Sequence, residues 1–268
     1  MHKPTVNESF WRAPPWQGGV RRQRLGLHRL AVWQAAALRP AVMENKRLQM
    51  RQRYSEVVAS TAGSEPVQAL LHLMPLARPL TRRHPDLIAD VALCVVEDLC
   101  LIDIEDQMRL VAGCVCAPSY WRLQDKIGRP LAAVHGPVPG MQRLMPSITR
   151  FMQKMPQGQP FQRANWFLHG DAGLFHQSTE LDLDESVQSW SVRSERQTLV
   201  KLNHRYLLFA IEVRCEPLAH LANFPDACRD MLRTLAHMPE AEIDYFGGVE
   251  KYQRIIEYVR SLLGDVDD

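Results

Sequence analysis

The sequence predicts an α+β fold with an antiparallel sheet of about five strands and flanking helices. Two pairs of apolar or alternating runs are each joined by a short polar turn, which is the pattern of a β-hairpin. Segments with a helical period lie before, between and after these runs. Strands joined in this way favour an antiparallel sheet.

The strands follow from patterns with a period of two residues. Glu105, Asp106 and Gln107 separate the runs of the first predicted hairpin, and Asn203-His204 is the turn of the second. The predicted strands are residues 99–104, 108–116, 161–168, 190–202 and 205–215, with one more short strand at residues 25–27.

The helices follow from spaced apolar residues and from start and stop signals. Ser64 is a predicted N-cap, and Gly128 and Gly140 end one helix and open another. The predicted helices span residues 35–58 with a break at Pro40, 64–76, 84–93, 120–127, 140–155, 224–238 and 249–263. Residues 1–24 predict irregular chain that packs Trp11 and Trp16 onto the body. We therefore expect a basic and helical extension over residues 1–90 and the sheet domain over residues 91–268.

Composition excludes several functional classes. The chain has 268 residues, is 46% hydrophobic and carries a formal net charge of +2, so it can build a large core and shows no signature of a nucleic-acid partner. An arginine-rich segment near the N-terminus predicts a solvated surface. No apolar run has the length of a membrane span and no secretory signal is recognisable, so we expect a cytoplasmic protein.

The six cysteines lack the spacing of the common zinc sites. They lie mostly in apolar runs, as small buried residues do in a reducing compartment. The alternative to a structural role is that Cys114 and Cys116 bind zinc. Only one residue separates them, however, and this spacing does not match the common structural zinc sites.

A histidine in a stiff frame is the leading site candidate. His135 follows the apolar run of residues 131–134 and precedes Gly-Pro-Val-Pro-Gly at residues 136–140. Pro137 restricts the backbone, and Gly136 permits close approach of another group. This placement suits a ring nitrogen that points at a fixed group. The residues alone favour the alternative, a buried histidine that is hydrogen-bonded to a neighbouring carbonyl.

Three ordered stretches resemble one family. They are PSYWRLQDKIGRPLAAVHGPVPG at residues 118–140, FQRANWFL at residues 161–168 and VRSERQTLVKL at residues 192–202. Together they resemble the catalytic-subunit family of haem-dependent oxidative N-demethylases of the dimethylamine-demethylating type. The resemblance covers about residues 85–260. The family's C-terminal Tyr-Lys-Gly element is Tyr245-Phe246-Gly247 here, so its substrate residues are not carried over.

The resemblance implies a PAS-like sheet with haem b against one face. It also implies oxidation of a small amine by dioxygen in a monooxygenase-type reaction, with no membrane and no nucleic acid involved. The electrons would come from NADPH through a separate reductase or electron-transfer subunit with flavin and iron–sulfur centres, because this chain has no dinucleotide fingerprint.

Haem needs an axial ligand, apolar walls and partners for two propionates. His135 is the predicted metal ligand, with His169, His176 and the turn residue His204 as competitors. The other predicted cofactor-binding residues are Gly136, Pro137, Trp121, Arg163, Arg193 and Arg196, of which Arg163 is also a catalytic candidate together with Asn165. Each of these residues also has a purely structural interpretation. The tryptophan would pack in the core, and the arginines would pair with Glu195 or Glu212.

Two further functions share this expected fold. One is a haem-binding PAS-like sensor or accessory subunit without turnover. The other is a PAS-like interaction module without haem, in which His135 is buried and no adjacent slot admits a porphyrin.

Overall fold

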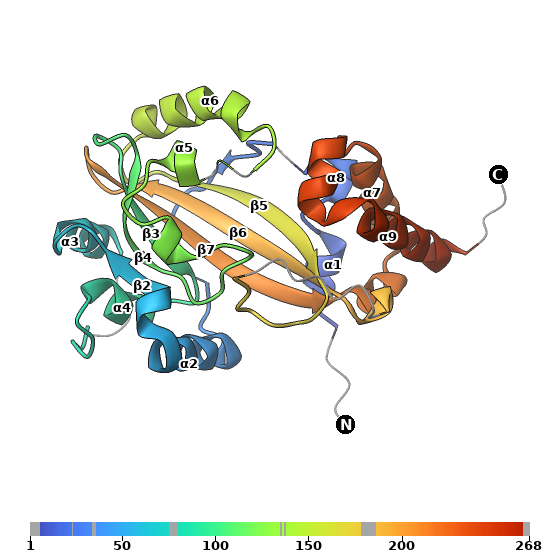
Figure 1. Cartoon of the computed structure of the whole chain (residues 1–268), viewed down its shortest axis with the longest axis horizontal. Coiled ribbons are helices and arrows are strands. Elements are labelled where there is room, and N and C mark those ends of the chain that lie inside the picture. The colour runs from blue at the N-terminus through green and yellow to red at the C-terminus, as the bar shows by residue number, and fades with distance from the viewer. Residues whose placement is uncertain are drawn as a thin grey trace.

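An antiparallel sheet is the scaffold of the molecule (Figure 1). The computed structural model describes residues 6–22, 24–33, 36–74, 80–134, 136, 138–177 and 186–264. Within these residues the sheet has seven strands in the order β1-β5-β6-β7-β3-β4-β2. The strands are β1 (His28–Arg29), β2 (Val58–Ser60), β3 (Asp98–Asp103), β4 (Arg109–Cys114), β5 (Pro160–His169), β6 (Ser191–Lys201) and β7 (Tyr206–Pro217).

The α+β class and the antiparallel sheet are confirmed, but the count of about five strands is wrong. Two short edge strands join the five predicted ones. β1 pairs with Phe161 and Gln162 and lies just after the predicted residues 25–27, and β2 continues directly from a helix and pairs with β4. Strands of two or three residues are too short to show a two-residue period. The first 90 residues thus supply both edges of the sheet.

Both predicted hairpins are present, and side-chain oxygens close their turns. Between β3 and β4, Asp103 Oδ1 accepts hydrogen bonds from two loop N–H groups at 3.1 and 3.2 Å. Between β6 and β7, Asn203 Oδ1 accepts from the N–H groups of Arg205 and Tyr206 at 2.9 and 2.7 Å. Short polar side chains favour turns because they satisfy backbone donors that no strand partner reaches.

The helices of the described residues form layers around this sheet. They are α1 (Glu8–Arg12), α2 (Pro40–Val57), α3 (Glu65–Leu73), α4 (Leu87–Ala92), α5 (Leu131–Val134), α6 (Met141–Lys154), α7 (Pro225–Ala236), α8 (Glu240–Phe246) and α9 (Gly248–Leu263). In Figure 1, α2, α3 and α4 gather at one end of the sheet, α5 and α6 lie on one side of it, and α7, α8 and α9 gather at its other end. None of the described helices is both long and apolar enough to cross a membrane.

Several helix predictions need correction. The helix predicted over residues 120–127 is only a 3-10 turn at Leu123–Asp125, and the apolar run 131–134 is one turn of helix. The helix expected from residue 35 begins at Pro40, because proline is well suited to a first helical turn. Helices α1 and α8 were not predicted, since five and seven residues give a weak period.

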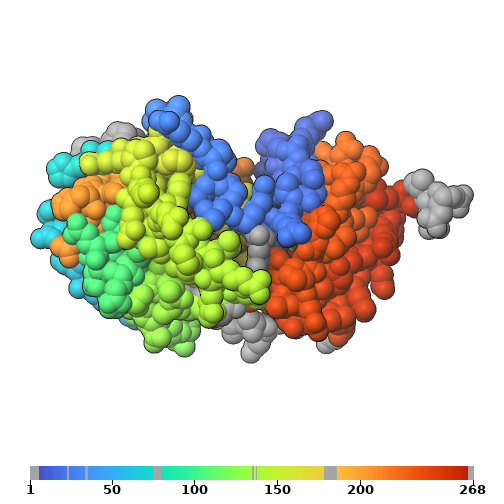
Figure 2. Space-filling view, turned by 90° about the horizontal axis from the view of Figure 1, so that it is seen from above, coloured from blue at the N-terminus to red at the C-terminus, as the bar shows by residue number. Residues whose placement is uncertain are grey.

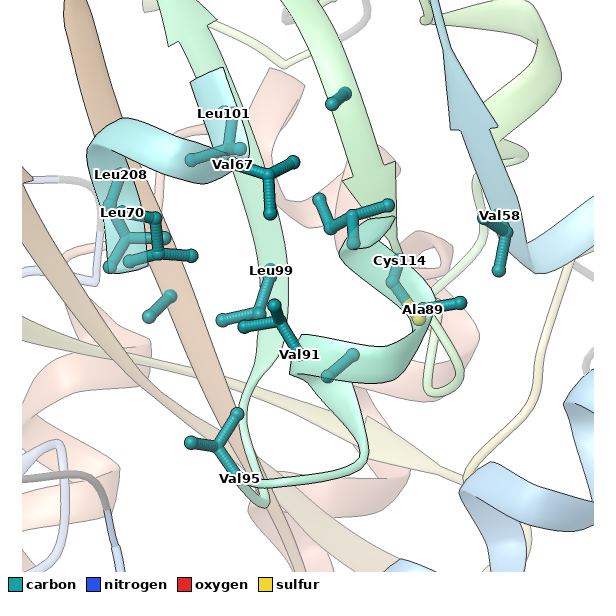
Figure 3. Packing of buried hydrophobic residues seen from close by; sticks show 14 of the residues in the cluster. Val58, Val67, Leu70, Ala89, Val91, Val95, Leu99, Leu101, Cys114 and Leu208 are labelled. Carbon is teal, nitrogen blue, oxygen red and sulfur yellow. The ribbon is translucent and has the colours of Figure 1, made fainter. Parts of the chain in front are cut away.

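One apolar layer lies between the sheet and helices α3 and α4. Figure 3 shows Leu99 and Leu101 of β3 and Leu208 of β7 beneath Val67 and Leu70 of α3. These five side chains are at most 3% exposed. Full burial of each such side chain contributes roughly 1.5–3 kcal/mol, so this layer fixes which face of the sheet carries helices.

A second apolar cluster holds the N-terminal segment, as predicted. Trp11 and Trp16 are 1% and 0% exposed. The ring of Trp16 lies 4.9 Å from that of Trp166 on β5, and its Nε1 donates to the carbonyl of Ala227 at 2.8 Å. The N-terminal tryptophans therefore join α7 to the sheet.

Two buried cations cover the outer edge of β5 where β1 has ended. Arg22 donates to the carbonyl of Trp166 at 3.4 Å, and Lys251 donates to the carbonyl of Leu168 at 2.5 Å. Arg22 also pairs with the buried Glu242 at 2.8 Å. The prediction of a solvated arginine-rich surface is therefore wrong for Arg22, which is 6% exposed.

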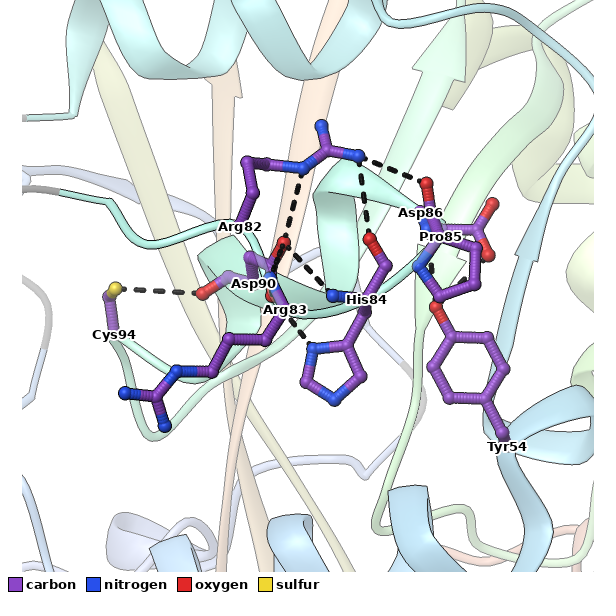
Figure 4. Close-up of polar contacts among 8 residues, drawn as sticks. All are labelled: Tyr54, Arg82, Arg83, His84, Pro85, Asp86, Asp90 and Cys94. Atoms are coloured by element: carbon purple, nitrogen blue, oxygen red, sulfur yellow. Dashed lines mark hydrogen bonds and ion pairs between the residues drawn. The ribbon is translucent and has the colours of Figure 1, made fainter.

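A buried carboxylate orders the segment before α4 (Figure 4). Asp90 is 3% exposed and accepts from the N–H of Arg83 at 3.1 Å and from the ring of His84 at 2.7 Å. The Arg82 guanidinium lies 3.4 Å from the same carboxylate. One carboxylate thus satisfies the donors of three successive residues.

We expect Asp90→Asn to lower the free energy of unfolding by about 1–3 kcal/mol, because an amide cannot accept all of these hydrogen bonds. Chemical denaturation measures the loss. The matched control is Asp106→Asn, which removes a surface ion pair to Arg109 at 3.0 Å and should cost roughly 0–1 kcal/mol. Equal losses in the two variants would contradict this role of Asp90.

Candidate functional site

A cavity of about 650 Å³ lies on the face of the sheet turned away from α3 and α4. Its floor is built by side chains of five strands, and its other walls come from residues within 115–134, from Val138 and from the end of α8. Ligand sites in proteins typically measure roughly 300–1,000 Å³, so this cavity has the size of a cofactor site. Figure 2 shows α6 (yellow-green) on one side of the molecule and the C-terminal helices (orange to red) on the other, with part of the N-terminal segment (blue) between them.

The floor of the cavity is divided between apolar and polar strands. Strands β3, β4 and β7 supply the apolar part, which is formed by Cys100, Ile102, Leu110, Phe209 and Ile211. Strands β5 and β6 supply Asn165, Glu195 and Gln197. The cavity can therefore hold a largely apolar group at one end and hydrogen-bond a polar group at the other.

The three sequence motifs converge on this cavity. Tyr120 and Trp121 come from the first motif, Asn165 from the second and Glu195 from the third. Asn165 and Glu195 are direct partners in the β5–β6 register, so they share a face of the sheet. Trp121 and Asn165 were predicted as site residues, and the structure places both in the cavity wall.

Arg163 lies on the same face of β5 but does not line the cavity. It is the register partner of Gln197, and its buried Nε has no hydrogen-bond partner in the described structure. Burial lowers the pKa of Arg163, while the nearby Glu195 carboxylate acts in the opposite direction. An unpartnered guanidinium nitrogen beside a cavity suits an incoming carboxylate.

The other two predicted arginines have protein partners. Arg193 is 1% exposed, donates to the carbonyls of Ala117 and Leu174, and has its Nε 3.6 Å from Glu195 Oε1. Arg196 lies on the opposite face of the sheet, with its Nε 2.6 Å from Glu212. Neither arginine lines the cavity. The contacts of both are those of the structural alternative, in which the arginine pairs with a glutamate.

Two members of the predicted histidine frame, His135 and Pro137, lie outside the described residues. Gly136 is exposed, and Val134 and Val138 line the cavity. The two described valines of this stretch therefore lie in the cavity wall.

The competing histidines occupy different surroundings. His204 is exposed beside the β6–β7 turn. His169 ends β5, is 0% exposed and stacks on Tyr120 with ring centroids 4.7 Å apart. Its Nε2 lies 3.2 Å from Ser119 Oγ and its Nδ1 lies 3.3 Å from His176 Nδ1. His169 therefore lies behind two residues of the cavity wall.

Nothing in the described residues forms a cluster of three or more metal-ligating side chains. The sulfur atoms of Cys114 and Cys116 lie 3.9 Å apart, and both residues are buried free thiols.

Sequence reasoning missed Ser119, Lys126, Glu195 and Gln197 as lining residues. The two β6 residues carried a usable signal, because alternation along the strand places residues 195 and 197 on one face and residue 196 on the other. The element Tyr245-Phe246-Gly247 also lines the cavity, so the departure from the family pattern falls at the site itself.

A family model of haem-dependent oxidative N-demethylase, alpha subunit-like proteins matches residues 21–261. This match confirms the resemblance carried by the three motifs. No curated protein matches the chain.

The buried His169 lowers the free energy of unfolding as the pH falls. Burial, followed by the charge of Arg193, lowers the pKa of His169 to about 2, so between pH 6.5 and pH 2 the unfolded chain binds a proton that the folded chain does not. We expect wild type to lose roughly 1 kcal/mol more than His169→Gln between pH 6 and pH 5. Urea titrations at both pH values measure this difference. The control, His204→Gln at an exposed site, should follow wild type, and identical pH slopes for wild type and His169→Gln would contradict the expectation.

Proposed function

This chain belongs to the family of haem-dependent oxidative N-demethylase, alpha subunit-like proteins, and on that premise we propose that it binds haem b in the cavity and oxidatively demethylates a small amine. The observation that carries the proposal is the convergence of all three family-like motifs on one cavity of about 650 Å³. We also propose that the five central strands β4-β3-β7-β6-β5 form the PAS-like sheet implied by the family.

The cavity residues fit a haem group. The apolar floor, together with Leu131, Val134 and Val138, suits a porphyrin face, and Trp121 adds an aromatic wall. His135 is the proposed axial ligand, because Val134 and Val138 on either side of it in the chain line the cavity. Lys126 in the wall and Arg163 beside it are proposed partners for the propionates.

The polar part of the floor fits an amine. Glu195 has a side chain that is 13% exposed. Its Oε1 lies 3.6 Å from Arg193 Nε, and its Oε2 accepts a hydrogen bond from Gln197 at 2.9 Å. A partly buried carboxylate attracts a cation, so we assign Glu195 to binding the substrate ammonium group. Asn165, directly opposite in the β5–β6 register, is proposed to hydrogen-bond the reacting molecules.

Bound haem would supply the activation of dioxygen. The proposed monooxygenase reaction converts an N-methylamine, dioxygen, two electrons and two protons into the demethylated amine, formaldehyde and water. The residues of this chain bind and orient the amine, and walls formed by the sheet and the loop of residues 115–138 limit access of water.

The electrons must come from a partner. The alpha-subunit part of the family name supports a multi-subunit assembly, and we propose a reductase or electron-transfer subunit that carries flavin and iron–sulfur centres and is reduced by NADPH. All six cysteines are free thiols, which supports the proposed cytoplasmic location.

Haem uptake tests the proposed site. Protein from haem-replete cells should show a Soret band and, once reduced, should bind carbon monoxide. His135→Ala should lose haem or change its spectrum, whereas His204→Ala at an exposed site should match wild type. Ile211→Trp should reduce haem occupancy by filling the cavity floor, and Ile211→Val is the matched control. Full occupancy in Ile211→Trp would place haem elsewhere, and a wild-type spectrum in His135→Ala would exclude that residue as ligand.

Turnover tests the reaction. Haem-loaded protein with a reductant should consume oxygen and release formaldehyde when a small N-methylamine is added. Glu195→Gln should raise KM for the amine by roughly tenfold or more, because a charge-assisted contact is worth about 1.5–3 kcal/mol. Its control is Glu216→Gln, which changes a carboxylate at the far end of β7. Haem binding without oxygen consumption across a panel of methylamines would contradict the enzymatic proposal.

A further inference from the structure

Four polar side chains form a continuous path from the cavity wall to the surface. Ser119, which lines the cavity, has its Oγ 3.2 Å from His169 Nε2. His169 Nδ1 lies 3.3 Å from His176 Nδ1, and His176 Nε2 lies 3.0 Å from Asp171 Oδ1. Side-chain exposure is 17% for His176 and 65% for Asp171, so the path begins in the cavity wall and ends in water.

The backbone holds these groups in place. The N–H of His176 donates to the carbonyl of Pro118 at 3.1 Å, and the N–H of Tyr120 donates to the carbonyl of His176 at 2.8 Å. The side chain of Arg193 binds the carbonyls of Ala117 and Leu174 and so ties both loops to β6. The path is therefore built from two loops that are locked to each other and to the sheet.

A glycine makes room for the outer end of the path. A Cβ atom at Gly173 would lie 2.8 Å from Asp171 Oδ1 and 3.3 Å from His176 Cε1. The N–H of Gly173 also donates to Asp171 Oδ1 at 2.5 Å. The chain thus folds tightly around the histidine–carboxylate pair.

The donor and acceptor groups of the four side chains fix the direction of every hydrogen bond in the path. The Asp171 carboxylate only accepts, so His176 Nε2 carries a hydrogen. In neutral His176 the Nδ1 atom is then an acceptor, and His169 Nδ1 must donate to it. His169 Nε2 is left as an acceptor for the hydroxyl of Ser119. One set of tautomers therefore satisfies all four groups.

We propose that Asp171, His176, His169 and Ser119 form a proton path between the solvent and the cavity. The need for such a path rests on the proposed function, whose reaction consumes two protons in a site walled off from water. The electrons of that reaction come from the proposed reductase, and the path carries protons alone.

The transfer balances at each atom. In the inward direction, protonated Asp171 gives its proton to His176 Nε2, the Nδ1 proton of His176 passes to His169 Nδ1, and the Nε2 proton of His169 passes to Ser119 Oγ. The hydroxyl proton of Ser119 then bonds to the acceptor in the cavity. This transfer leaves the outward-directed tautomers described above, with Asp171 ionised. The starting state returns when the hydrogen bonds of the path break, when each imidazole loses its ring proton to water and takes another on its other nitrogen, and when solvent protonates Asp171.

The groups around His169 disfavour its positively charged form, so His169 passes a proton on and does not retain it. Arg193, His176 and Lys251 all oppose a positive charge on His169. Tyr120 stacks on its ring, and burial raises the pKa of Tyr120 to about 12, so no phenolate compensates that charge. Cys215, whose thiol contacts the carbonyl of Gly173, is likewise kept neutral because burial raises its pKa to about 11. His169 is thus a relay between neighbours and not a store of charge.

The tautomers can be tested without turnover. In haem-free protein, nitrogen NMR of the imidazoles should show a protonated Nδ1 in His169 and a protonated Nε2 in His176. Asp171→Asn removes the acceptor-only group and should give a mixed tautomer in His176, whereas Asp226→Asn on the exposed start of α7 should not. A protonated Nε2 in His169 of the wild type would overturn the proposal.

The holoenzyme gives an independent test. His176→Gly should lower kcat by roughly 10- to 100-fold, with an unchanged KM for the amine and an unchanged haem spectrum, and added imidazole should restore the rate. Ser119→Ala should lower kcat in the same way, and His204→Gly should match wild type. Full activity in both path variants, or a loss in His176→Gly that imidazole does not restore, would overturn the path. A wild type that binds haem but turns over no amine would refute the proposed function, and the NMR result would still decide the path.

Discussion

The pairing of β5 with β6 is the constraint on which the site depends. Ten residues of β5 lie opposite ten of β6, and β6 is paired along its other edge with β7. Alternation along β6 then places Glu195 towards the cavity and Arg196 towards the helices. Because the side-chain period of a strand is two, a slip of one residue would exchange these faces and put an arginine in the cavity floor. Val200 of β6 is a buried member of the apolar cluster beneath α3 and α4, and a slip of β6 by one residue would turn Val200 away from that cluster.

Buried arginine and lysine side chains also stabilise the fold, because they hold segments outside the sheet against it. Within the described residues Arg22, Lys46, Arg193 and Lys251 are the buried cations, and each donates to at least one backbone carbonyl. A buried charge is unfavourable unless it is paired and hydrogen-bonded. Arg22, Lys46 and Arg193 are also paired with Glu242, Asp98 and Glu195. The ammonium group of Lys251 lies over the rings of Trp190 and Phe246, and burial lowers the pKa of Lys251 to about 7. The cavity wall is therefore ordered by long side chains as well as by the sheet.

The features that could be predicted from the sequence are those set by residues close together in the chain. Features set by contacts between distant residues could not be predicted. The two hairpins and β5 followed from local alternation and turn chemistry. The motifs contribute Trp121 and Asn165 to the wall of the candidate cavity. The edge strands β1 and β2 did not follow, because their pairing joins residues distant in sequence and their length shows no period. The roles of Arg193 and Arg196 did not follow either. Arginine on a strand suits both a ligand and a structural partner, and only the fold brings Glu212 to one arginine and two loop carbonyls to the other. The strand predicted over residues 161–168 stops one residue short of His169, which is the last residue of β5 and is buried.

The contacts along the outer edge of β5 also bear on how the protein behaves in a crowded solution. An open strand edge offers carbonyl and N–H groups to any other extended chain, and long uncovered edges promote edge-to-edge aggregation. β1 covers only Phe161 and Gln162 of this edge. Farther along, the guanidinium of Arg22 and the ammonium group of Lys251 occupy the carbonyls of Trp166 and Leu168, which would otherwise be free to accept from an incoming strand. A cation from the N-terminal segment and another from α9 thus protect this part of the β5 edge against intermolecular β-pairing.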